Sequence, residues 1–382
     1  MPDAILSHVR LDAVYAAVPE REIRIEDELE YYGGSRKKAE RARKIIGTDR
    51  RRIAWPGLKA SDLCLAAAGR LLDEREVDRA FVDALILVTQ SPDFDLPATA
   101  CRLQETLGLS RHCAAFDVNQ GCSGYVYGLW MAAGLIASGA CSRVLLLAGD
   151  APYMPRPANN RIIAPIFGDG GSASLLTREE GASLAFDLGT DGSGYKHIII
   201  PGGRAALPYR RNFAENRAFF EDIVDASGTA WRLNEVFMNG SAIFDFTLNV
   251  IPKHIKSVLH RHELSPEDID WLFLHQANKQ IVESIAGKTG FAPEKAPSVA
   301  FSRYGNLSSA SIPAALCEHF GQRGGSGRTT MLFCGYGVGL SWASCLVRGQ
   351  EVTCAPVISV PNGQDDAPDA VRRWQNLMQS PA

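Results

Sequence analysis

Short apolar runs alternate with longer alanine-rich segments along most of the chain, and this alternation predicts a layered α/β protein. The short runs are rich in Val, Ile and Leu, which is typical of buried strands. The alanine-rich segments have the length and composition of helices. We predict strands at residues 84–89, 144–149, 173–176, 271–275, 329–334 and 341–347.

The longest apolar stretch, residues 126–147, is interrupted by Ser138, Gly139, Ser142 and Arg143. A membrane-spanning helix needs about 20 consecutive apolar residues. The interruptions therefore predict a buried helix followed by a buried strand. We expect no membrane partner for this chain.

The two halves of the chain resemble each other. VDALILVTQ at 82–90 is similar to IDWLFLHQ at 269–276, an offset of 187 residues (from 82 to 269). A second pair of similar segments contains Cys122 in the first half and Asn306 in the second, an offset of 184 (from 122 to 306). Two such similar offsets indicate a duplicated unit, which would bring Cys122 and Asn306 to equivalent turns that face each other.

This duplication predicts the organisation of the chain. We expect an N-terminal half at residues 1–180, a C-terminal half at residues 181–350, and one active site between them. Residues 351–382 contain several Pro, Gly and Asp residues and are expected to form an extension with a short surface helix at 370–378. The sequence indicates no function for this extension.

Composition narrows the class of protein. The chain has 382 residues, of which 46% are hydrophobic and 22% charged, so it can bury a large core. Its net charge of -3 argues against a nucleic-acid partner. The nine cysteines include no CxxC pair and no matching cluster of histidines. We therefore expect a cytoplasmic protein with free thiols and without a metal site, and the N-terminus lacks a secretory pattern.

Three residues with complementary chemistry lie in glycine- or alanine-rich turns beside apolar runs: Cys122, His275 and Asn306. A thiol, an imidazole and a carboxamide supply one nucleophile and two hydrogen-bond donors, which carbon–carbon bond formation from two thioesters requires. Cys122 precedes a predicted buried helix, whose N-terminus is expected to favour the thiolate and lower the pKa of the thiol. His275 is expected at the end of a central strand.

Each of the three residues also has a purely structural interpretation. Cys122 could be an inert buried thiol, His275 a core histidine, and Asn306 a turn residue or helix N-cap. The equivalent positions of Cys122 and Asn306 in the two halves, with His275 opposite the cysteine segment, favour the catalytic interpretation. The other cysteines and histidines are interpreted as structural.

Five segments carry a resemblance to a known family. In their order and spacing, the chain resembles the β-ketoacyl-acyl-carrier-protein synthase III family of the thiolase superfamily over residues 5–350: FDVNQGCSGYVYGL, IFGDGGSASLL, FLHQAN, YGNLSSASIP and GYGVGLSWAS. The resemblance implies a thiolase-like α/β fold, with duplicated α-β-α-β-α halves and mixed sheets in five layers. It also implies a homodimer.

The resemblance implies a two-step reaction. An acyl-coenzyme A or acyl-acyl-carrier-protein donor would acylate Cys122, with the oxyanion held by the backbone N–H groups of Cys122 and Val338. Malonyl-acyl-carrier-protein would then bind, and His275 and Asn306 would donate hydrogen bonds to its thioester carbonyl during decarboxylative condensation. The reaction requires no metal or redox cofactor.

The chain departs from the family pattern at several positions. Val338 stands where the family usually has glycine, although a backbone N–H survives the change. Arg41 stands near the position where the family often has a tryptophan that holds coenzyme A, and Gln280 replaces an arginine often found after HQAN. These changes favour another carrier protein or a specialised thioester as the acyl donor.

Two further features bear on substrates. Leu96 takes the place of the bulky aromatic gate that reaches across the family's dimer into the neighbour's acyl pocket, which would admit longer or branched chains. A basic run is interpreted either as a docking patch for an acidic carrier protein or as a solvated helix face: Arg36, Lys37, Lys38, Arg41, Arg43 and Lys44.

Three other functions fit parts of the pattern. A Cys, His, Asn order also occurs in papain-like hydrolases, but the chain lacks their nucleophile segment and carries the duplication. A thiolase-fold acyltransferase could pass the acyl group to a different O, N or C acceptor. A non-enzymatic partner subunit of a related synthase is disfavoured by the intact trio.

Overall fold

The computed structural model describes residues 3–151, 160, 163, 165–210 and 213–363. The predicted helix at 370–378 lies outside these residues. Within them, no helix is both long enough and apolar enough to cross a membrane.

Nine strands form one large mixed sheet in the described part of the chain. The strand order is β12-β13-β14-β1-β7-β6-β4-β5, with β15 paired to β1 and β14 paired also to β7. The bounds of these strands are β1 Asp3–Pro19, β4 Ala84–Val88, β5 Ala114–Val118, β6 Arg143–Asp150, β7 Gly170–Thr190, β12 Trp271–Leu274, β13 Gly325–Gly337, β14 Ser341–Cys354 and β15 Ile358–Val360.

The long strands β1 and β7 join two halves of this sheet. The first part of β7 pairs with β6 in the first half, whereas its last part pairs with β14 in the second. β1 pairs with β7 along both parts. The boundary that we predicted at residue 180 therefore separates two pairing stretches of β7 without interrupting the strand.

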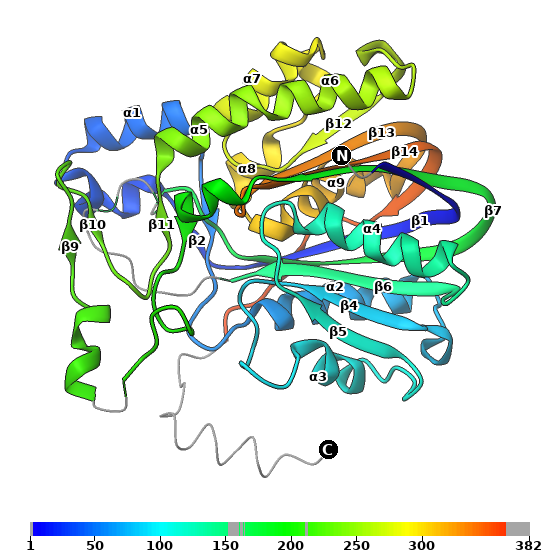
Figure 1. Cartoon of the computed structure of the whole chain (residues 1–382), viewed down its shortest axis with the longest axis horizontal. Helices are drawn as coiled ribbons and strands as arrows, with labels where there is room; N and C mark the ends of the chain where they lie inside the picture. Colours follow the sequence, from blue (N-terminus) through cyan, green and yellow to red (C-terminus); the bar gives the residue numbers. More distant parts are fainter. Residues whose placement is uncertain (1–2, 152–159, 161–162, 164, 211–212, 364–382) are drawn as a thin grey trace.

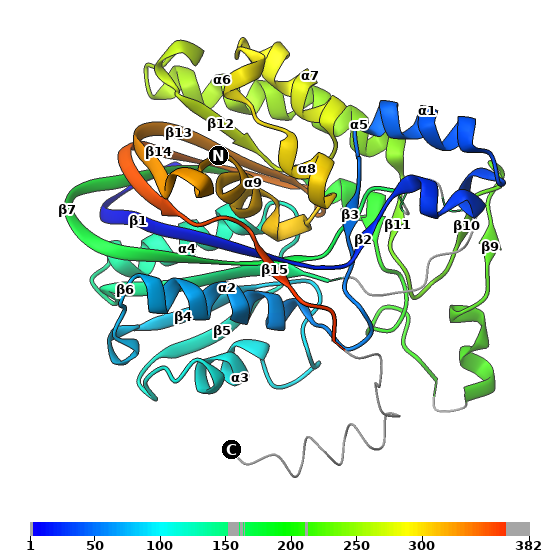
Figure 2. The ribbon, with the colours of Figure 1, turned by 180° about the vertical axis from the view of Figure 1, so that it is seen from behind.

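Helices form three layers: one lies between the two sheet halves, and one covers the outer face of each half (Figures 1 and 2). The central layer contains α4 (Gly124–Ala137) and α9 (Ser311–Phe320). One outer layer contains α2 (Ala60–Glu74) and α3 (Thr99–Thr106), and the other contains α5 (Gly240–Asn249), α6 (Ile251–Arg261) and α7 (Lys279–Thr289). These helices and the sheet halves form the five-layer α-β-α-β-α arrangement that the resemblance implied.

The hydrophobic core follows this layering. One cluster joins α4 and α9 to strands of both halves, a second joins α2 and α3 to the first half, and a third joins α5, α6 and α7 to the second half. All five residues of β4 are buried, as expected for a strand covered on both faces. Burial of the central helices places their N-terminal turns inside the molecule.

The predicted duplication is visible in matching contacts. Asp83 donates its N–H to the carbonyl of Arg143 and accepts the N–H of Arg143 on its carboxylate. Asp270 makes the same two contacts with Thr330. Parallel strands β4 and β6 in the first half correspond to parallel strands β12 and β13 in the second, and an antiparallel strand follows in each case.

The predicted strands are all present, but the sequence interpretation missed others. β1 and β5 were not predicted, and β7, β13 and β14 are longer than expected. Residues 351–360, assigned to a C-terminal extension, belong to the sheet because β14 continues to Cys354 and β15 pairs in parallel with β1. The boundary that we predicted at residue 351 therefore falls inside the sheet, which continues to Val360.

Shorter elements lie at the edge of the layers. The helices are α1 (Arg36–Ile46) and α8 (Val299–Tyr304). Three two-stranded ribbons are formed by β2 (Glu22–Ile23) with β3 (Arg51–Arg52), β8 (Ile198–Ile199) with β11 (Phe237–Met238), and β9 (Ile223–Val224) with β10 (Ala230–Trp231). Figure 1 shows α1 and the β9–β10 ribbon on the same side of the molecule.

Candidate active site

Cys122 lies in the turn between β5 and α4, directly before the Ser123 N-cap of that helix. The end of β13 runs beside it: a Cβ atom added to Gly337 would lie 2.9 Å from the Cys122 sulfur. A side chain at position 337 would therefore collide with the thiol. Glycine at this position lets the backbone of β13 lie close to the sulfur. The backbone of Val338 also faces the sulfur and favours its ionised form.

Burial raises the pKa of the Cys122 thiol to about 11. The residue as a whole is half-buried, but its sulfur is enclosed. The backbone of Val338, the side chain of Ser308 and the thiol's own backbone N–H oppose this shift without overcoming it. Our expectation of a lowered pKa was therefore wrong, because desolvation of the thiolate outweighs the helix N-terminus.

His275 follows the last residue of β12 and is buried. Its backbone is fixed on both sides: its N–H donates to the Cys334 carbonyl at 2.9 Å, and its carbonyl accepts from the Tyr336 hydroxyl at 3.0 Å. Burial lowers the pKa of the imidazole to about 3. The ring is therefore neutral near pH 7, and its Nδ1 is buried with no hydrogen-bond partner among the described residues.

Asn306 follows α8 and is buried. Its backbone is held in the first half of the chain, because its N–H donates to the Ile166 carbonyl at 2.8 Å and its carbonyl accepts from Gly168 at 3.0 Å. The Oδ1 of its side chain accepts the N–H of Ser308 at 2.9 Å. Since this bond assigns Oδ1 as the acceptor, the Nδ2 group is the donor that can serve a ligand.

Ser308 connects the three candidate residues. Its backbone N–H binds Asn306, its backbone also interacts with the imidazole of His275, and its side chain interacts with the Cys122 thiol. Ser308 has a φ of 51°, in the left-handed region that non-glycine residues rarely adopt. The structure thus brings Cys122, His275 and Asn306 around one residue, and their assignment to a single active site between the halves stays a prediction.

Asp150, at the end of β6, is a part of this site that the sequence interpretation missed. Its buried carboxylate accepts hydrogen bonds from the Gln90 N–H at 2.7 Å and from the Ser309 hydroxyl at 2.8 Å. It also interacts with the Ser308 side chain, and burial raises its pKa. Asp150 thereby links the turn after β4 to the segment that carries Asn306.

Val338 lies between β13 and β14, and we call residues 338–340 the Val338 loop. Its neighbours Gly337 and Gly339 have φ values of 153° and 136°, which favour glycine. The Val338 carbonyl accepts a hydrogen bond from the Ser341 hydroxyl at 2.7 Å. This loop can therefore present the Val338 N–H to the space beside the Cys122 sulfur.

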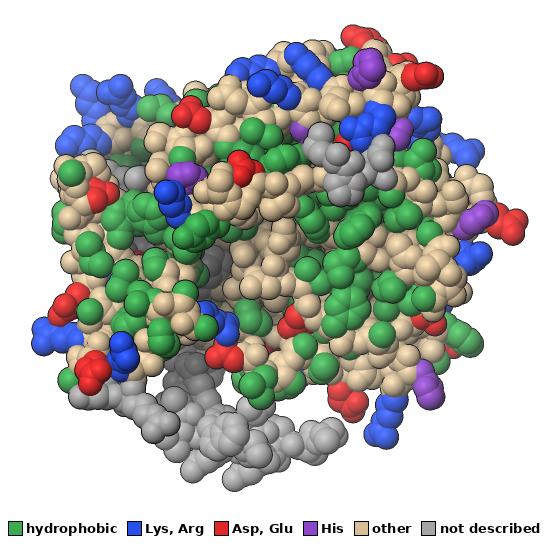
Figure 3. All heavy atoms as spheres, in the orientation of Figure 1, with side chains coloured by type: hydrophobic (Ala, Val, Ile, Leu, Met, Phe, Trp, Pro, Cys, Tyr) green, Lys and Arg blue, Asp and Glu red, His purple; other side chains and the backbone are tan. Residues whose placement is uncertain are grey.

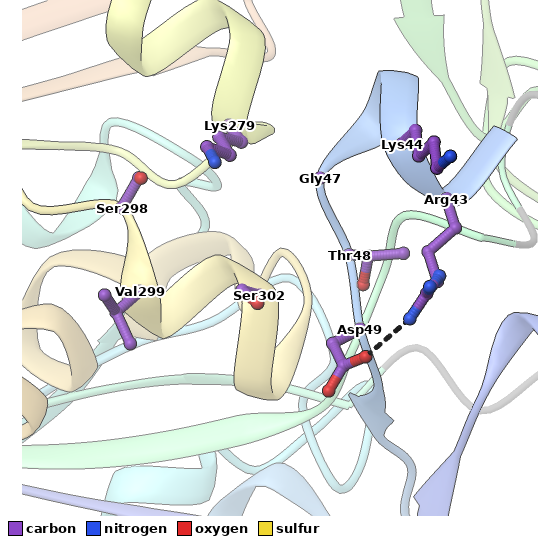
Figure 4. Close-up of a pocket in the computed structure, with 9 residues that line it drawn as sticks. All are labelled: Arg43, Lys44, Gly47, Thr48, Asp49, Lys279, Ser298, Val299 and Ser302. Carbon is purple, nitrogen blue, oxygen red and sulfur yellow. Dashed lines mark hydrogen bonds and ion pairs between the residues drawn. The ribbon is translucent and has the colours of Figure 1, made fainter. Parts of the chain in front are cut away.

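The predicted basic run forms part of α1. Arg36, Lys37, Lys38, Arg41 and Lys44 are exposed, whereas Arg43 is half-buried and paired with Asp49 at 3.1 Å. Figure 4 shows Arg43 and Lys44 beside a pocket of about 410 Å³, with Lys279 contributed by the start of α7. Lys279 is the first residue of α7 and lies four residues after His275 in the sequence.

Leu96 lies on the loop before α3, and 82% of its surface is exposed. The neighbouring Asp95 pairs with Arg204. Among the described residues, no group of three or more His, Cys, Asp or Glu side chains could hold a metal ion.

Comparisons with known proteins show the family of this chain. The model of "3-Oxoacyl-[acyl-carrier-protein (ACP)] synthase III" matches residues 116–192, and the model of its C-terminal part matches residues 259–349. The chain is 35% identical over 344 residues to a putative 3-oxoacyl-[acyl-carrier-protein] synthase 3 of Campylobacter jejuni, covering 90% of this chain and 94% of that protein. It is 32% identical to a β-ketoacyl-[acyl-carrier-protein] synthase III of Caldanaerobacter subterraneus, covering 79% and 87%, respectively.

A solved structure gives the same result in three dimensions. The 3-oxoacyl-(acyl-carrier protein) synthase from Burkholderia xenovorans superposes with a TM-score of 0.83 at 32% identity, covering 95% of this chain and 99% of that chain. The fold and these similarities define a thiolase-like condensing enzyme, which is an acyltransferase. The chain belongs to the 3-oxoacyl-acyl-carrier-protein synthase III family.

Proposed function

We propose that this enzyme transfers an acyl group from a thioester donor to Cys122 and then condenses it with malonyl-acyl-carrier-protein. The observation that carries the proposal is the convergence of Cys122, His275 and Asn306 on Ser308. A nucleophile and two separate neutral donors are the groups that this pair of reactions requires.

In the first step, the Cys122 sulfur attacks the donor's carbonyl carbon, and the donor's thiol leaves with the proton. The negative charge on the carbonyl oxygen is stabilised by the backbone N–H groups of Cys122 and Val338. Both N–H groups favour negative charge at the sulfur, which supports their position beside the reacting carbon. The burial that raises the pKa of the thiol also strengthens these hydrogen bonds, because the site has a low dielectric constant.

In the second step, malonyl thioester loses carbon dioxide, and the electrons of the broken bond form an enolate. His275 and the Asn306 Nδ2 group donate hydrogen bonds to the enolate oxygen. Because burial lowers the pKa of His275, its imidazole is neutral near pH 7 and donates this hydrogen bond from the N–H of the neutral ring. The enolate carbon then attacks the acyl group on Cys122, and the 3-oxoacyl thioester leaves as the thiolate is restored.

The acyl donor is proposed to be a carrier-bound or specialised thioester that docks at α1. The exposed side chains of Arg36, Lys37, Lys38, Arg41 and Lys44 form a positive surface, to which an acidic carrier protein would be attracted. In this proposal, the phosphate of the carrier's thioester arm binds in the pocket lined by Arg43, Lys44 and Lys279, whose positive charges support the assignment. Arg41 and Gln280 distinguish this surface from the family's coenzyme A pattern.

We propose a homodimer in which Leu96 of one copy borders the acyl pocket of the other. Leu96 is highly exposed in the single chain, and β5 forms an edge of the large sheet. An exposed strand edge can pair with a second chain. Figure 3 shows apolar side chains gathered over the face that carries α4, where Trp130 is 37% exposed.

Cytoplasmic location follows from the proposed condensation with malonyl-acyl-carrier-protein, because acyl carrier proteins and reduced cysteines belong to that compartment.

The proposal is tested by measuring product formation. Purified enzyme is mixed with malonyl-acyl-carrier-protein and a panel of acyl-coenzyme A and acyl-carrier-protein donors, and 3-oxoacyl-carrier-protein is quantified by mass spectrometry. We expect product from the wild type and none from Cys122→Ala, with carrier-protein donors preferred. Reversing the charge of Lys37 and Lys38 to Glu should raise the KM for the carrier protein. Acyl transfer without a 3-oxoacyl product would instead indicate a different O, N or C acceptor.

A further inference from the structure

Ser123 occupies the N-cap position of α4, yet its side chain makes no capping hydrogen bond. Serine at an N-cap ordinarily accepts a hydrogen bond from a backbone N–H in the first turn. The Ser123 hydroxyl instead lies 2.7 Å from the hydroxyl of Ser341, the first residue of β14. Both side chains are buried. The helix that begins beside Cys122 therefore uses its capping residue for a contact with the end of the Val338 loop.

The direction of each hydrogen bond in this cluster follows from the donors available. Gln120 Nε2 donates to the Ser123 hydroxyl at 3.1 Å and to the Ser341 hydroxyl at 3.0 Å. Ser341 gives its single hydrogen to the Val338 carbonyl at 2.7 Å. Ser123 must then donate to Ser341, because a hydroxyl has only one hydrogen. The result is a directed chain from Gln120 through Ser123 and Ser341 to the Val338 carbonyl.

The Val338 loop depends on this chain because its own backbone is permissive. Gly337 and Gly339, on either side of Val338, have positive φ values and few steric restrictions. The Val338 side chain packs close to the turn between β5 and α4 that carries Cys122, which we call the nucleophile turn, since a Cβ added to Gly121 would lie 2.5 Å from Val338 Cγ1. The Ser341 hydroxyl therefore fixes a loop that two glycines would otherwise leave free to move.

We propose that Gln120, Ser123 and Ser341 are positioning residues that hold the Val338 N–H in place for the oxyanion formed when Cys122 is acylated. This inference rests on the proposed function. A donor lowers the barrier most when it is fixed before the charge develops. The three side chains act through the loop and the nucleophile turn, so they support acyl transfer to Cys122 rather than the decarboxylation that His275 and Asn306 assist.

The test compares two buried serines of the same strand. Ser341→Ala removes the bond to the Val338 carbonyl, whereas Ser344→Ala removes a hydroxyl that contacts His254 at 2.8 Å. Acylation of Cys122 is followed by rapid quench and intact mass, and decarboxylation of malonyl-acyl-carrier-protein is followed separately. Ser341→Ala should slow acylation about 10- to 100-fold. This effect is at most about that of removing one oxyanion donor entirely. Decarboxylation should change by less than about twofold.

The remaining variants distinguish positioning from simple structural damage. Ser344→Ala should leave both rates within about twofold of the wild type, and Ser341→Thr, which keeps the hydroxyl, should restore acylation. Gln120→Met provides a second test from the half-buried end of the cluster if Ser341→Ala lowers the melting temperature. Equal loss of both reactions, or normal acylation in Ser341→Ala and Gln120→Met, would overturn the inference. Failure of the wild type to become acylated would overturn the proposed function and this inference with it.

Discussion

The hydroxyl of Ser309 donates a 2.8 Å hydrogen bond to the carboxylate of Asp150, and this bond joins the two halves of the chain beside the candidate site. The same carboxylate accepts the N–H groups of Gln90 and Ser309. One buried acidic side chain thus holds the turn after β4 against the segment that follows Asn306. The candidate site depends on this contact because its residues come from both halves.

Removing this carboxylate is predicted to destabilise the fold and the site together. Asp150→Ala removes the acceptor of the buried Ser309 N–H and hydroxyl groups and of the part-buried Gln90 N–H, so we expect a loss of about 2–5 kcal/mol in the free energy of unfolding. Urea denaturation measures this loss. The control is Asp95→Ala, an exposed carboxylate near Leu96, for which we expect a change below about 1 kcal/mol. Similar losses in both variants would show that Asp150 does not hold the halves together.

Two glycines of α4 are predicted to respond oppositely to alanine. A Cβ at Gly128 would lie 2.7 Å from Leu146 Cδ1 and 2.9 Å from Val88 Cγ2, whereas a Cβ at Gly134 would meet nothing within 4 Å. Gly134→Ala should therefore stabilise the helix by about 0.5–1 kcal/mol. Gly128→Ala should destabilise the protein by about 1–3 kcal/mol through overpacking. The melting temperatures of both variants test the close packing of α4 on the sheet. Equal changes in the two variants would contradict it.

Alkylation of Cys122 is predicted to accelerate steadily with pH. Because burial raises the pKa of the thiol to about 11, its thiolate fraction should rise about tenfold per pH unit between pH 7 and pH 10. Iodoacetamide labelling, measured by peptide mass with circular dichroism to confirm folding, gives the rate at each pH. A plateau above pH 8 would mean that the helix N-terminus dominates, as the sequence alone suggested.

Two buried histidines are predicted to make the fold sensitive to acid. Burial lowers the pKa of His275 to about 3 and that of His254 to about 4; Asp187 lies 3.7 Å from His254 but is paired with Arg261 at 2.6 Å. Below pH 6.5 the unfolded chain binds protons that the folded protein excludes, so stability falls as pH decreases. Each histidine contributes a slope of about 1.4 kcal/mol per pH unit.

His254→Gln tests this linkage without altering the candidate site. Glutamine can keep a hydrogen bond to Ser344 but does not titrate. Between pH 6 and pH 5, the free energy of unfolding measured in urea should fall less steeply in the variant, by about 1.4 kcal/mol per pH unit. An unchanged slope would contradict a neutral buried His254.

The sequence predicted those elements whose signal is local. Strands such as β4 and β12 are continuous apolar runs, and the duplicated aspartates Asp83 and Asp270 directly precede them. β1 was missed because His8, Arg10 and Asp12 interrupt its apolar residues, although its alternation of Val9, Leu11 and Ala13 with polar residues is itself a strand signal. The strand nevertheless lies in the middle of the sheet.

The sequence predicted only those parts of the candidate site that lie in recognisable motifs. Cys122, His275 and Asn306 stand in recognisable turns, and their catalytic roles stay predictions. Asp150 was missed because its partners Gln90 and Ser309 lie 60 and 159 residues away in the sequence. The pKa of Cys122 was predicted in the wrong direction because the extent of burial depends on the complete fold. Local motifs thus predicted the candidate groups, whereas tertiary contacts determine their pKa values and their hydrogen-bond partners.

The central claim is that Cys122 carries the acyl group and that malonyl-acyl-carrier-protein removes it. Intact-mass spectrometry of the protein after incubation with acyl thioesters, before and after addition of malonyl-acyl-carrier-protein, tests this claim most directly. We predict an acyl adduct on the wild type, none on Cys122→Ala, and loss of the adduct with release of a 3-oxoacyl thioester. In His275→Ala and Asn306→Ala the adduct should form but persist. An adduct that forms on Cys122→Ala, or no adduct with any donor, would contradict the account.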